Sequence, residues 1–330
     1  MKAVLESGQK LNKRIRLILG LNEEKNWKCI NHYKEIGEEI PNIGFSPDAD
    51  FPCIYAEKGI LSLQLVHPFS LENIEILEID CNQNALNVVP KYCSITLKFN
   101  DLENQINFKE NTDISIEKIN ENTIKIISTG IAAHAAHPDL GKNAIANLIQ
   151  YLNSYSSQNN ILTKLEKLGI FEIASPKFLS SEKIEDESGI LTSNVGFLGF
   201  ENGNIQIGLN LRVPVNTPLE QIQEKYLSLQ NNFTELSVKF TSFQNPLYVP
   251  KDSYLVKTLT EIFNRKTGLD AKPIAIGGGT YARAFPNCVA FGSTFPGQKD
   301  MCHQVDEFID IDCLMTSSKI YAEAIYELGK

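Results

Sequence analysis

The sequence predicts an α/β domain that is interrupted by an inserted α+β domain. Short apolar runs followed by helix-like segments occur near both ends of the chain, whereas residues 60–245 are rich in alternating apolar and polar residues. The length of 330 residues is about that of two domains. The predicted boundaries are residues 1–58 and 246–330 for the discontinuous α/β domain, and residues 59–245 for the inserted domain.

The first part of the α/β domain is predicted to contain one short helix and two strands. Residues 3–8 are predicted as the end of a helix, because a glycine commonly follows the last helical turn. The apolar run 15–19 and residues 53–55 are predicted as short buried strands. Glu23 and Glu24 follow the first of them, at the end of the strand where open α/β sheets bind their ligands.

The inserted domain is predicted as an antiparallel sheet with helices packed on it. Alternation predicts strands at residues 60–66, 74–79, 94–99, 124–127, 191–200 and 205–213. An Asn-Gly pair between the last two favours a hairpin, because both residues tolerate positive φ. One helix is predicted to start near Pro138 and to include 144–152. A second is predicted to start with a capping box at Thr217 and to end near residue 230.

After Pro246 the sequence returns to the α/β pattern. The predicted elements are a helix at 252–266, strands at 273–276 and 289–292, and a final helix at 312–328. The residues Gly277, Gly278, Gly279 and Thr280 follow the first of these strands. Three glycines let backbone N–H groups approach an anionic ligand closely. The loop is neither a phosphate-binding P-loop nor a dinucleotide fingerprint, because the lysine and the glycine spacing that those motifs need are missing.

Composition argues against several classes of protein. The net charge is −9, whereas nucleic-acid binding needs a basic surface. No apolar run reaches the ~20 residues of a membrane-spanning helix, and residues 1–8 lack the apolar segment and cleavage site of a signal peptide, so we do not expect export. The seven cysteines are scattered without a C-x-x-C pair, as expected of free thiols in a reducing compartment. The sequence therefore predicts a cytoplasmic protein that binds neither nucleic acid nor a membrane.

Four further polar residues are candidates for a functional site. Asp48 lies in a proline-bounded loop before a strand, and His303 precedes an acidic stretch. His134 lies at the foot of a predicted helix, where anionic ligands are attracted. Arg212 ends a hairpin strand, where a guanidinium can bind a carboxylate with two hydrogen bonds or simply cover the sheet. Each residue alone has an ordinary structural explanation, so their joint order carries the prediction.

Five blocks occur in a characteristic order along the chain. They are N-E-E-K-N-W-K at 22–28, G-F-S-P-D-A-D-F-P at 44–52 with E-K-G at 57–59, A-H-A-A-H-P at 133–138 with G-K-N-A at 141–144, I-G-G-G-T-Y-A-R at 276–283, and H-Q-V-D-E-F at 303–308. With these blocks the chain resembles the di-zinc metallopeptidase family M20, and it is most similar to the peptidase V-like dipeptidase branch.

The resemblance implies a zinc-peptidase catalytic domain with an inserted α+β lid domain of ferredoxin-like type. It implies that Glu23 is the general base, that Glu24 and His303 bind one zinc ion, and that Asp48 binds the other. Two Zn²⁺ ions would be the cofactor, with Mn²⁺ or Co²⁺ as substitutes. The substrate implied is an unblocked dipeptide. The enlarged lid of this branch implies a monomer.

The resemblance also assigns residues to substrate binding. His134 matches an oxyanion stabiliser of the lid, Arg212 matches a clamp for the substrate carboxylate, and Asn87 matches a substrate-contacting asparagine. The loop of Gly277, Gly278, Gly279 and Thr280 would hold the C-terminal side of the substrate.

The sequence departs from the family pattern in one respect. The H-x-D motif and the zinc-bridging aspartate that precede the Glu-Glu pair in the family have no counterpart here, so we expect a truncated catalytic domain whose first strands are missing. Three interpretations stay open. The first is a dipeptidase that is active only if the missing segment is supplied, either by a separately encoded N-terminal chain or by a true start codon upstream of Met1. The second is a non-catalytic remnant or binding module that retains carboxylate recognition. The third is an N-acyl amino acid deacylase or desuccinylase.

Overall fold

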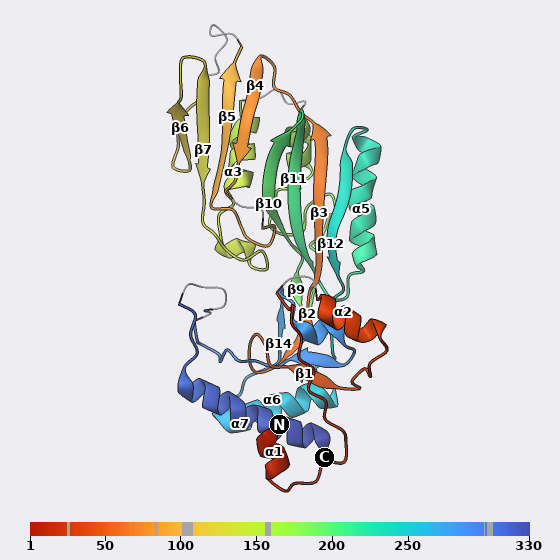
Figure 1. The fold of residues 1–330 in the computed structure, drawn as a ribbon. Coiled ribbons are helices and arrows are strands. Elements are labelled where there is room, and N and C mark those ends of the chain that lie inside the picture. Colours follow the sequence, from red (N-terminus) through yellow and green to blue (C-terminus); the bar gives the residue numbers. More distant parts are fainter. Residues whose placement is uncertain (25–26, 83–84, 101–107, 156–159, 300, 302–305) are drawn as a thin grey trace. The chain divides into compact units, whose positions relative to one another are not determined.

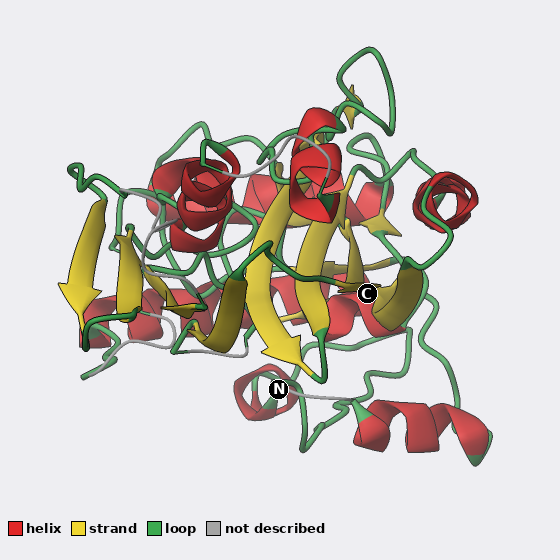
Figure 2. Ribbon diagram, turned by 90° about the horizontal axis from the view of Figure 1, so that it is seen from above, coloured by secondary structure: helices red, strands yellow, loops and turns green. Residues whose placement is uncertain are grey.

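The computed structural model describes residues 1–330 except 25–26, 83–84, 101–107, 156–159, 300 and 302–305. The chain folds into two compact units: unit 1 comprises residues 1–58 and 246–330, and unit 2 comprises residues 59–245. Helices and strands are mixed throughout the chain (Figures 1 and 2), which confirms the predicted α/β class. The assignment of unit 1 as a catalytic domain and unit 2 as a lid stays a prediction.

Unit 1 is built on a five-stranded sheet. Its order is β1 (Gly44–Ser46), β15 (Cys288–Ala290), β2 (Ile54–Glu57) and β13 (Leu247–Tyr248), and β14 (Ile274–Ile276) also pairs with β2. β14 is parallel to β2, and Ile276 lies opposite Glu57. Because parallel strands end at the same edge of a sheet, the loop that follows Ile276 begins beside Glu57.

The helices of unit 1 pack around an aromatic core. They are α1 (Lys2–Glu6), α2 (Lys28–Glu35), α6 (Tyr254–Thr267), α7 (Ile311–Gly329) and the 3₁₀ helix η2 (Tyr281–Ala284). The ring of Phe51 contacts the rings of Phe263, Phe291 and Tyr321, and α6 packs on α7. The predicted end of α6 is confirmed: Gly268 has φ 74° and donates its N–H to the Asn264 carbonyl.

The strand predicted at residues 15–19 is wrong. Residues 11–20 form neither helix nor strand, and no other described residue makes a backbone hydrogen bond with residues 14–20. A strand exists only where a second strand satisfies its N–H and C=O groups. Leu17, Leu19 and Leu21 are 64, 78 and 91% exposed. The apolar run therefore indicated a tendency to be buried, but the described part of unit 1 supplies no strand to pair with it.

Unit 2 contains two four-stranded antiparallel sheets (Figure 1). The first has the order β10 (Thr192–Glu201), β11 (Asn204–Val213), β3 (Gly59–Pro68), β12 (Ser237–Gln244), and the second has β4 (Ile74–Asp80), β5 (Tyr92–Phe99), β7 (Thr123–Thr129), β6 (Ile114–Lys118). The short strands β8 (Glu185–Asp186) and β9 (Gly189–Ile190) form a small ribbon. A ferredoxin-like unit has a single four-stranded sheet, so that prediction describes unit 2 only in part.

The helices of unit 2 are α3 (Ala144–Asn153), α4 (Ile161–Lys167) and α5 (Leu219–Asn232), preceded by the 3₁₀ turn η1 (Pro138–Leu140). α3 contacts β5, β7 and β10 and thereby joins the two sheets. It does not start near Pro138 as predicted, because the 3₁₀ turn ends first and Asn143 caps α3 by accepting two backbone N–H groups. The capping box at Thr217 is also wrong: α5 follows Pro218 without a side-chain cap.

The predicted hairpin between β10 and β11 is confirmed. Asn202 and Gly203 have φ values of 49° and 76°, so both central residues of the turn are left-handed. The hairpin ends at Thr192 on one strand and Arg212 on the other, which face each other across the ladder.

Candidate functional site

The glycine loop, residues 277–280, connects the end of β14 to the start of η2. Gly278 and Gly279 are half-buried, and neither has a left-handed φ. Among the described residues, none accepts a hydrogen bond from the backbone N–H of either glycine. The N–H of Thr280 is already used, because it donates to Oε2 of Glu57 at 3.1 Å. The loop therefore presents two backbone N–H groups that a ligand can bind, rather than the run of N–H groups that the sequence suggested.

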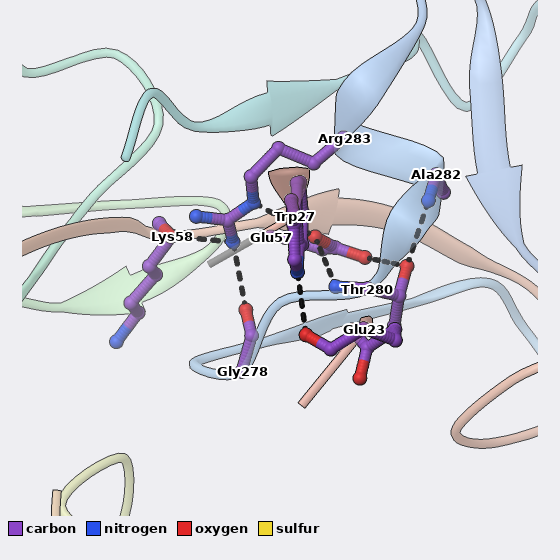
Figure 3. Close-up of polar contacts among 8 residues, drawn as sticks. All are labelled: Glu23, Trp27, Glu57, Lys58, Gly278, Thr280, Ala282 and Arg283. Atoms are coloured by element: carbon purple, nitrogen blue, oxygen red, sulfur yellow. Dashed lines mark hydrogen bonds and ion pairs between the residues drawn. The ribbon is translucent and has the colours of Figure 1, made fainter. Parts of the chain in front are cut away.

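A buried ion pair lies beside this loop (Figure 3). Nε of Arg283 donates to Oε2 of Glu57 at 3.0 Å, and the two side chains are 4 and 0% exposed. The Thr280 hydroxyl donates to Oε1 of Glu57 at 2.7 Å. Burial raises the pKa of the Glu57 carboxyl, whereas the charge of Arg283 and the hydrogen bonds from Thr280 act in the opposite direction. Sequence reasoning assigned no role to this pair, although both residues lie within the motif blocks.

The turn that carries Glu23 and Glu24 is tied to the residue that follows the glycine loop. The Glu23 carbonyl accepts the indole N–H of Trp27 at 2.6 Å, and the Trp27 ring meets the Tyr281 ring edge-to-face at 5.4 Å. The Tyr281 hydroxyl accepts the backbone N–H of Asn22 at 3.0 Å. Burial and the hydrogen bond with Cys29 raise the pKa of Tyr281, and the charge of Glu23 adds a smaller contribution in the same direction. The structure therefore joins the Glu23 turn to Tyr281, the residue that follows the glycine loop.

Asp48 follows β1 in a tight turn. Its Oδ1 accepts the backbone N–H of Ala49 at 2.8 Å, and Ala49 has φ 63°. The carboxylate is half-buried and lies close enough to α7 that its charge, after burial itself, raises the pKa of Tyr321. Asp48 is thus held in one orientation by its own loop.

The described residues do not complete a metal centre. His303 lies outside the described residues. Within the described ranges, no group of three His, Cys, Asp or Glu side chains is placed to hold a metal ion. A zinc site needs three or four convergent ligands. Glu24 and Asp48 therefore do not amount to a zinc site by themselves.

In unit 2, the predicted residues Asn87 and His134 lie on neighbouring segments. Val88 and His134 form a β-bridge, and the Asn87 carbonyl accepts the N–H of Ala135 at 2.9 Å. Nδ1 of His134 accepts the N–H of Ala136 at 3.2 Å, which leaves the proton of the neutral imidazole on Nε2. Both side chains are exposed.

A network of buried amides holds these segments. The Asn194 side-chain amide donates to the carbonyls of Leu86 and Val88, both at 2.9 Å. Its own oxygen accepts from Asn143 at 3.1 Å. Asn194 is 1% exposed and carries no predicted role. It is nevertheless the residue that fixes the backbone on either side of Asn87.

Arg212 lies at the end of β11 and is 4% exposed. Its Nε donates to the Asn210 side chain at 2.9 Å, and Asn210 donates in turn to the Ser62 hydroxyl at 2.9 Å. Thr192, which faces Arg212 across the hairpin, contacts the Ala135 carbonyl at 3.5 Å. Arg212 therefore lies on β11, and the neighbouring strand β10 contacts residue 135, which follows His134.

The chain matches Peptidase family M20/M25/M40 over residues 1–327, and it belongs to that family. It is 36% identical over 349 residues to "Putative dipeptidase YtjP" of Bacillus subtilis, with 100% of this chain and 73% of that protein covered. It is 32% identical over 330 residues to a "Putative dipeptidase" of Staphylococcus epidermidis, with 96 and 70% covered. The predicted class, a hydrolase acting on peptide bonds, is confirmed at the level of the family.

Solved structures of lower similarity include the aminoacylhistidine dipeptidase of Vibrio alginolyticus, with a TM-score of 0.45 and 14% identity over 89% of this chain. Another is the aminopeptidase PepT of Bacillus cereus, with a TM-score of 0.44 and 14% identity over 88% of this chain. The chain spans 66 and 58% of these two proteins. Within the described residues, no helix is both long and apolar enough to cross a membrane.

Proposed function

We propose that this chain is a metal-dependent dipeptidase that hydrolyses unblocked dipeptides. The observation that carries the proposal is the junction at Tyr281, which ties the Glu23 turn to the glycine loop. The Glu23 carboxylate could act on the scissile amide of a substrate, and the N–H groups of Gly278 and Gly279 could bind a carboxylate. A dipeptide has both groups close together. Membership of a peptidase family and the names of its curated relatives support the same reaction.

In this proposal each candidate residue has a defined role in catalysis, substrate binding or metal binding. Glu23 accepts a proton from the attacking water and passes it to the leaving amine. Gly278 and Gly279 donate their N–H groups to the substrate carboxylate. Arg212 and His134 of unit 2 are the proposed carboxylate clamp and oxyanion stabiliser, and Asn87 is a proposed substrate contact. Zinc, or manganese or cobalt in its place, is the proposed metal, and Glu24, Asp48 and His303 are its proposed ligands from this chain.

We also propose that a separately encoded polypeptide segment completes unit 1. Unit 1 contains an apolar cavity of about 800 Å³ between residues 13–18, residues 39–47 and α7. β1 is the edge strand beside it, and residues 14–20 leave their backbone groups unpaired among the described residues. An extended apolar segment that adds a strand would satisfy both features. The monomeric state and the cytoplasmic location stay predictions.

The test is hydrolysis of a panel of unblocked dipeptides by the purified chain, with and without zinc, manganese or cobalt. We expect little turnover from the chain alone, because its described residues do not complete a metal site. With the upstream segment of a relative present, we expect metal-dependent turnover that falls about 10²–10⁴-fold in Glu23→Ala, because the general base is lost. The exposed Glu35→Ala is the matched control and should keep full activity. The same assay is repeated with the upstream segment of a relative added in trans, which should raise turnover if that segment docks.

Other results would favour the alternatives. Faster cleavage of N-acyl amino acids than of dipeptides would indicate a deacylase. A folded chain that hydrolyses neither class of substrate, even with the added segment, would indicate a non-catalytic remnant and would overturn the proposed activity.

A further inference from the structure

We infer that Glu57 and Arg283 are positioning residues that set the glycine loop in the shape that binds the substrate carboxylate. The inference rests on the proposed function and extends it to a pair that does not touch the reacting atoms. Four features of the loop and of the ion pair support it.

The first feature is the fork of hydrogen bonds made by Arg283 (Figure 3). Its Nε donates to Glu57 at 3.0 Å, while Nη2 donates to the carbonyls of Lys58 at 3.0 Å and Gly278 at 2.8 Å. A planar guanidinium can bond to several acceptors in fixed directions, which a lysine ammonium cannot do. One buried side chain therefore ties the end of β2 to the middle of the loop.

The second feature is the orientation of the peptide that joins Gly278 to Gly279. In a trans peptide the C=O and the N–H point in opposite directions. Because the Gly278 carbonyl points to Arg283, the N–H of Gly279 points away from it. Arg283 thereby orients one of the two available donors, the N–H of Gly279, away from the buried guanidinium.

The third feature is the next peptide, which Glu57 fixes. Glu57 accepts both the N–H of Thr280 at 3.1 Å and the Thr280 hydroxyl at 2.7 Å. The N–H of Thr280 is thus turned inward, and the carbonyl of Gly279, in the same peptide, is turned outward. Arg283 and Glu57 therefore fix the orientations of two consecutive peptide groups of the loop, those between residues 278 and 279 and between residues 279 and 280.

The fourth feature is the packing of Arg283 on Gly279. A Cβ at residue 279 would lie 2.9 Å from Cζ and 2.9 Å from Nη2 of Arg283. Since Gly279 does not have a left-handed φ, its small size is needed for this close contact rather than for an unusual backbone conformation. The glycine in the motif is therefore explained by the arginine four residues later.

A purely structural brace would affect stability, whereas a positioning pair also affects how the loop distinguishes a carboxylate from a neutral amide. Arg283→Lys separates the two roles. The lysine keeps a positive charge near Glu57 but loses the fork that holds Gly278 and Lys58. We expect it to retain most of the stability and to lose the preference for a carboxylate.

The experiment measures binding to the chelator-treated full chain, so that no substrate is consumed. The probes are leucylglycine and leucylglycinamide, which differ only at the C-terminal carboxylate. Trp27, the single tryptophan of the sequence, is the fluorescent reporter because its ring contacts Tyr281, the residue after the loop. We expect the native chain to bind the acid at least about tenfold more tightly than the amide, since a hydrogen bond to a charged group is worth that much.

In Arg283→Lys and in Glu57→Gln we expect this preference to fall below about twofold. The matched control, the exposed Arg265→Lys on α6, should keep it. The thermal unfolding midpoint of each variant shows whether it is folded, and Glu57→Gln decides the question if Arg283→Lys does not fold. A folded variant of either kind that keeps the tenfold preference would overturn the inference.

The outcome is independent of the hydrolysis assay. A native chain that hydrolyses dipeptides but binds acid and amide equally would refute the carboxylate role of the loop and leave the proposed activity standing. A native chain that prefers the acid but hydrolyses nothing would refute the activity and leave the positioning role standing.

Discussion

The two units hold their candidate site residues by different chemistry. In unit 1, a buried ion pair between Glu57 and Arg283 fixes the glycine loop. In unit 2, neutral amides hold the backbone instead. Asn194 donates hydrogen bonds to the backbone carbonyls on both sides of Asn87, and it accepts one from Asn143. Both arrangements are buried, with Glu57 at 0% and Asn194 at 1% exposed.

The difference predicts different responses to mutation and to pH. Removal of one partner of a buried ion pair leaves an uncompensated charge, which is far more costly than an unpaired amide or carbonyl. A carboxyl also titrates, whereas an asparagine does not. Unit 1 should therefore be fragile and sensitive to pH at its loop, and unit 2 should be more tolerant and indifferent to pH.

The largest effect should come from Arg283→Met. We expect it to lower the free energy of unfolding by about 3–5 kcal/mol at pH 8, because the Glu57 carboxylate is then buried without a counter-charge. Urea unfolding followed by Trp27 fluorescence measures this, since Trp27 belongs to unit 1. A loss below about 1 kcal/mol would mean that water or another group replaces the arginine.

The pH dependence of the same variant sharpens the test. Without Arg283, only the hydrogen bonds from Thr280 still oppose the effect of burial, so the pKa of Glu57 in the folded protein rises further above its value in the unfolded chain. The folded state then binds a proton more readily, so its stability is retained at low pH and lost as the pH rises through the raised pKa. The deficit of Arg283→Met should shrink between pH 8 and pH 5. It should no longer vary with pH in the double variant with Glu57→Gln.

An intermediate effect is expected in unit 2 from Asn194→Ala. Two backbone carbonyls and the Asn143 amide each lose one hydrogen bond, which should cost about 2 kcal/mol in total. The loss should be the same at pH 5 and pH 8, because no titrating group is involved. Thermal unfolding by circular dichroism measures it, with the exposed Asn231→Ala as control. If the loss of stability in Asn194→Ala varied with pH, the predicted difference in pH dependence between the two units would be wrong.

The elements that sequence predicted well are those fixed by local chemistry. The β10–β11 hairpin depends on an Asn-Gly pair with positive φ, and the end of α6 depends on Gly268. Residues 15–19 failed because an apolar run does not reveal whether a second strand is present to pair with it. Their neighbours in the described structure provide none.

The candidate site shows the same division. The glycine loop and the Glu-Glu pair are contiguous motifs and could be singled out directly. The Glu57–Arg283 bond joins residues 226 positions apart, and the Asn194–Leu86 bond joins residues 108 positions apart. These contacts follow from strand register, such as Ile276 opposite Glu57, and composition or spacing does not specify that register.

The smallest effect tests the link between a motif glycine and the ion pair. Gly279→Ala should cost about 1 kcal/mol, because its Cβ would press on the Arg283 guanidinium at 2.9 Å. In an Arg283→Ala background the guanidinium is absent, so Gly279→Ala should change the free energy of unfolding by no more than about 0.3 kcal/mol. Urea unfolding of the four members of this cycle measures the coupling. If the two costs simply add, the cost of a side chain at residue 279 does not come from Arg283, and the arginine no longer explains why this loop needs a glycine.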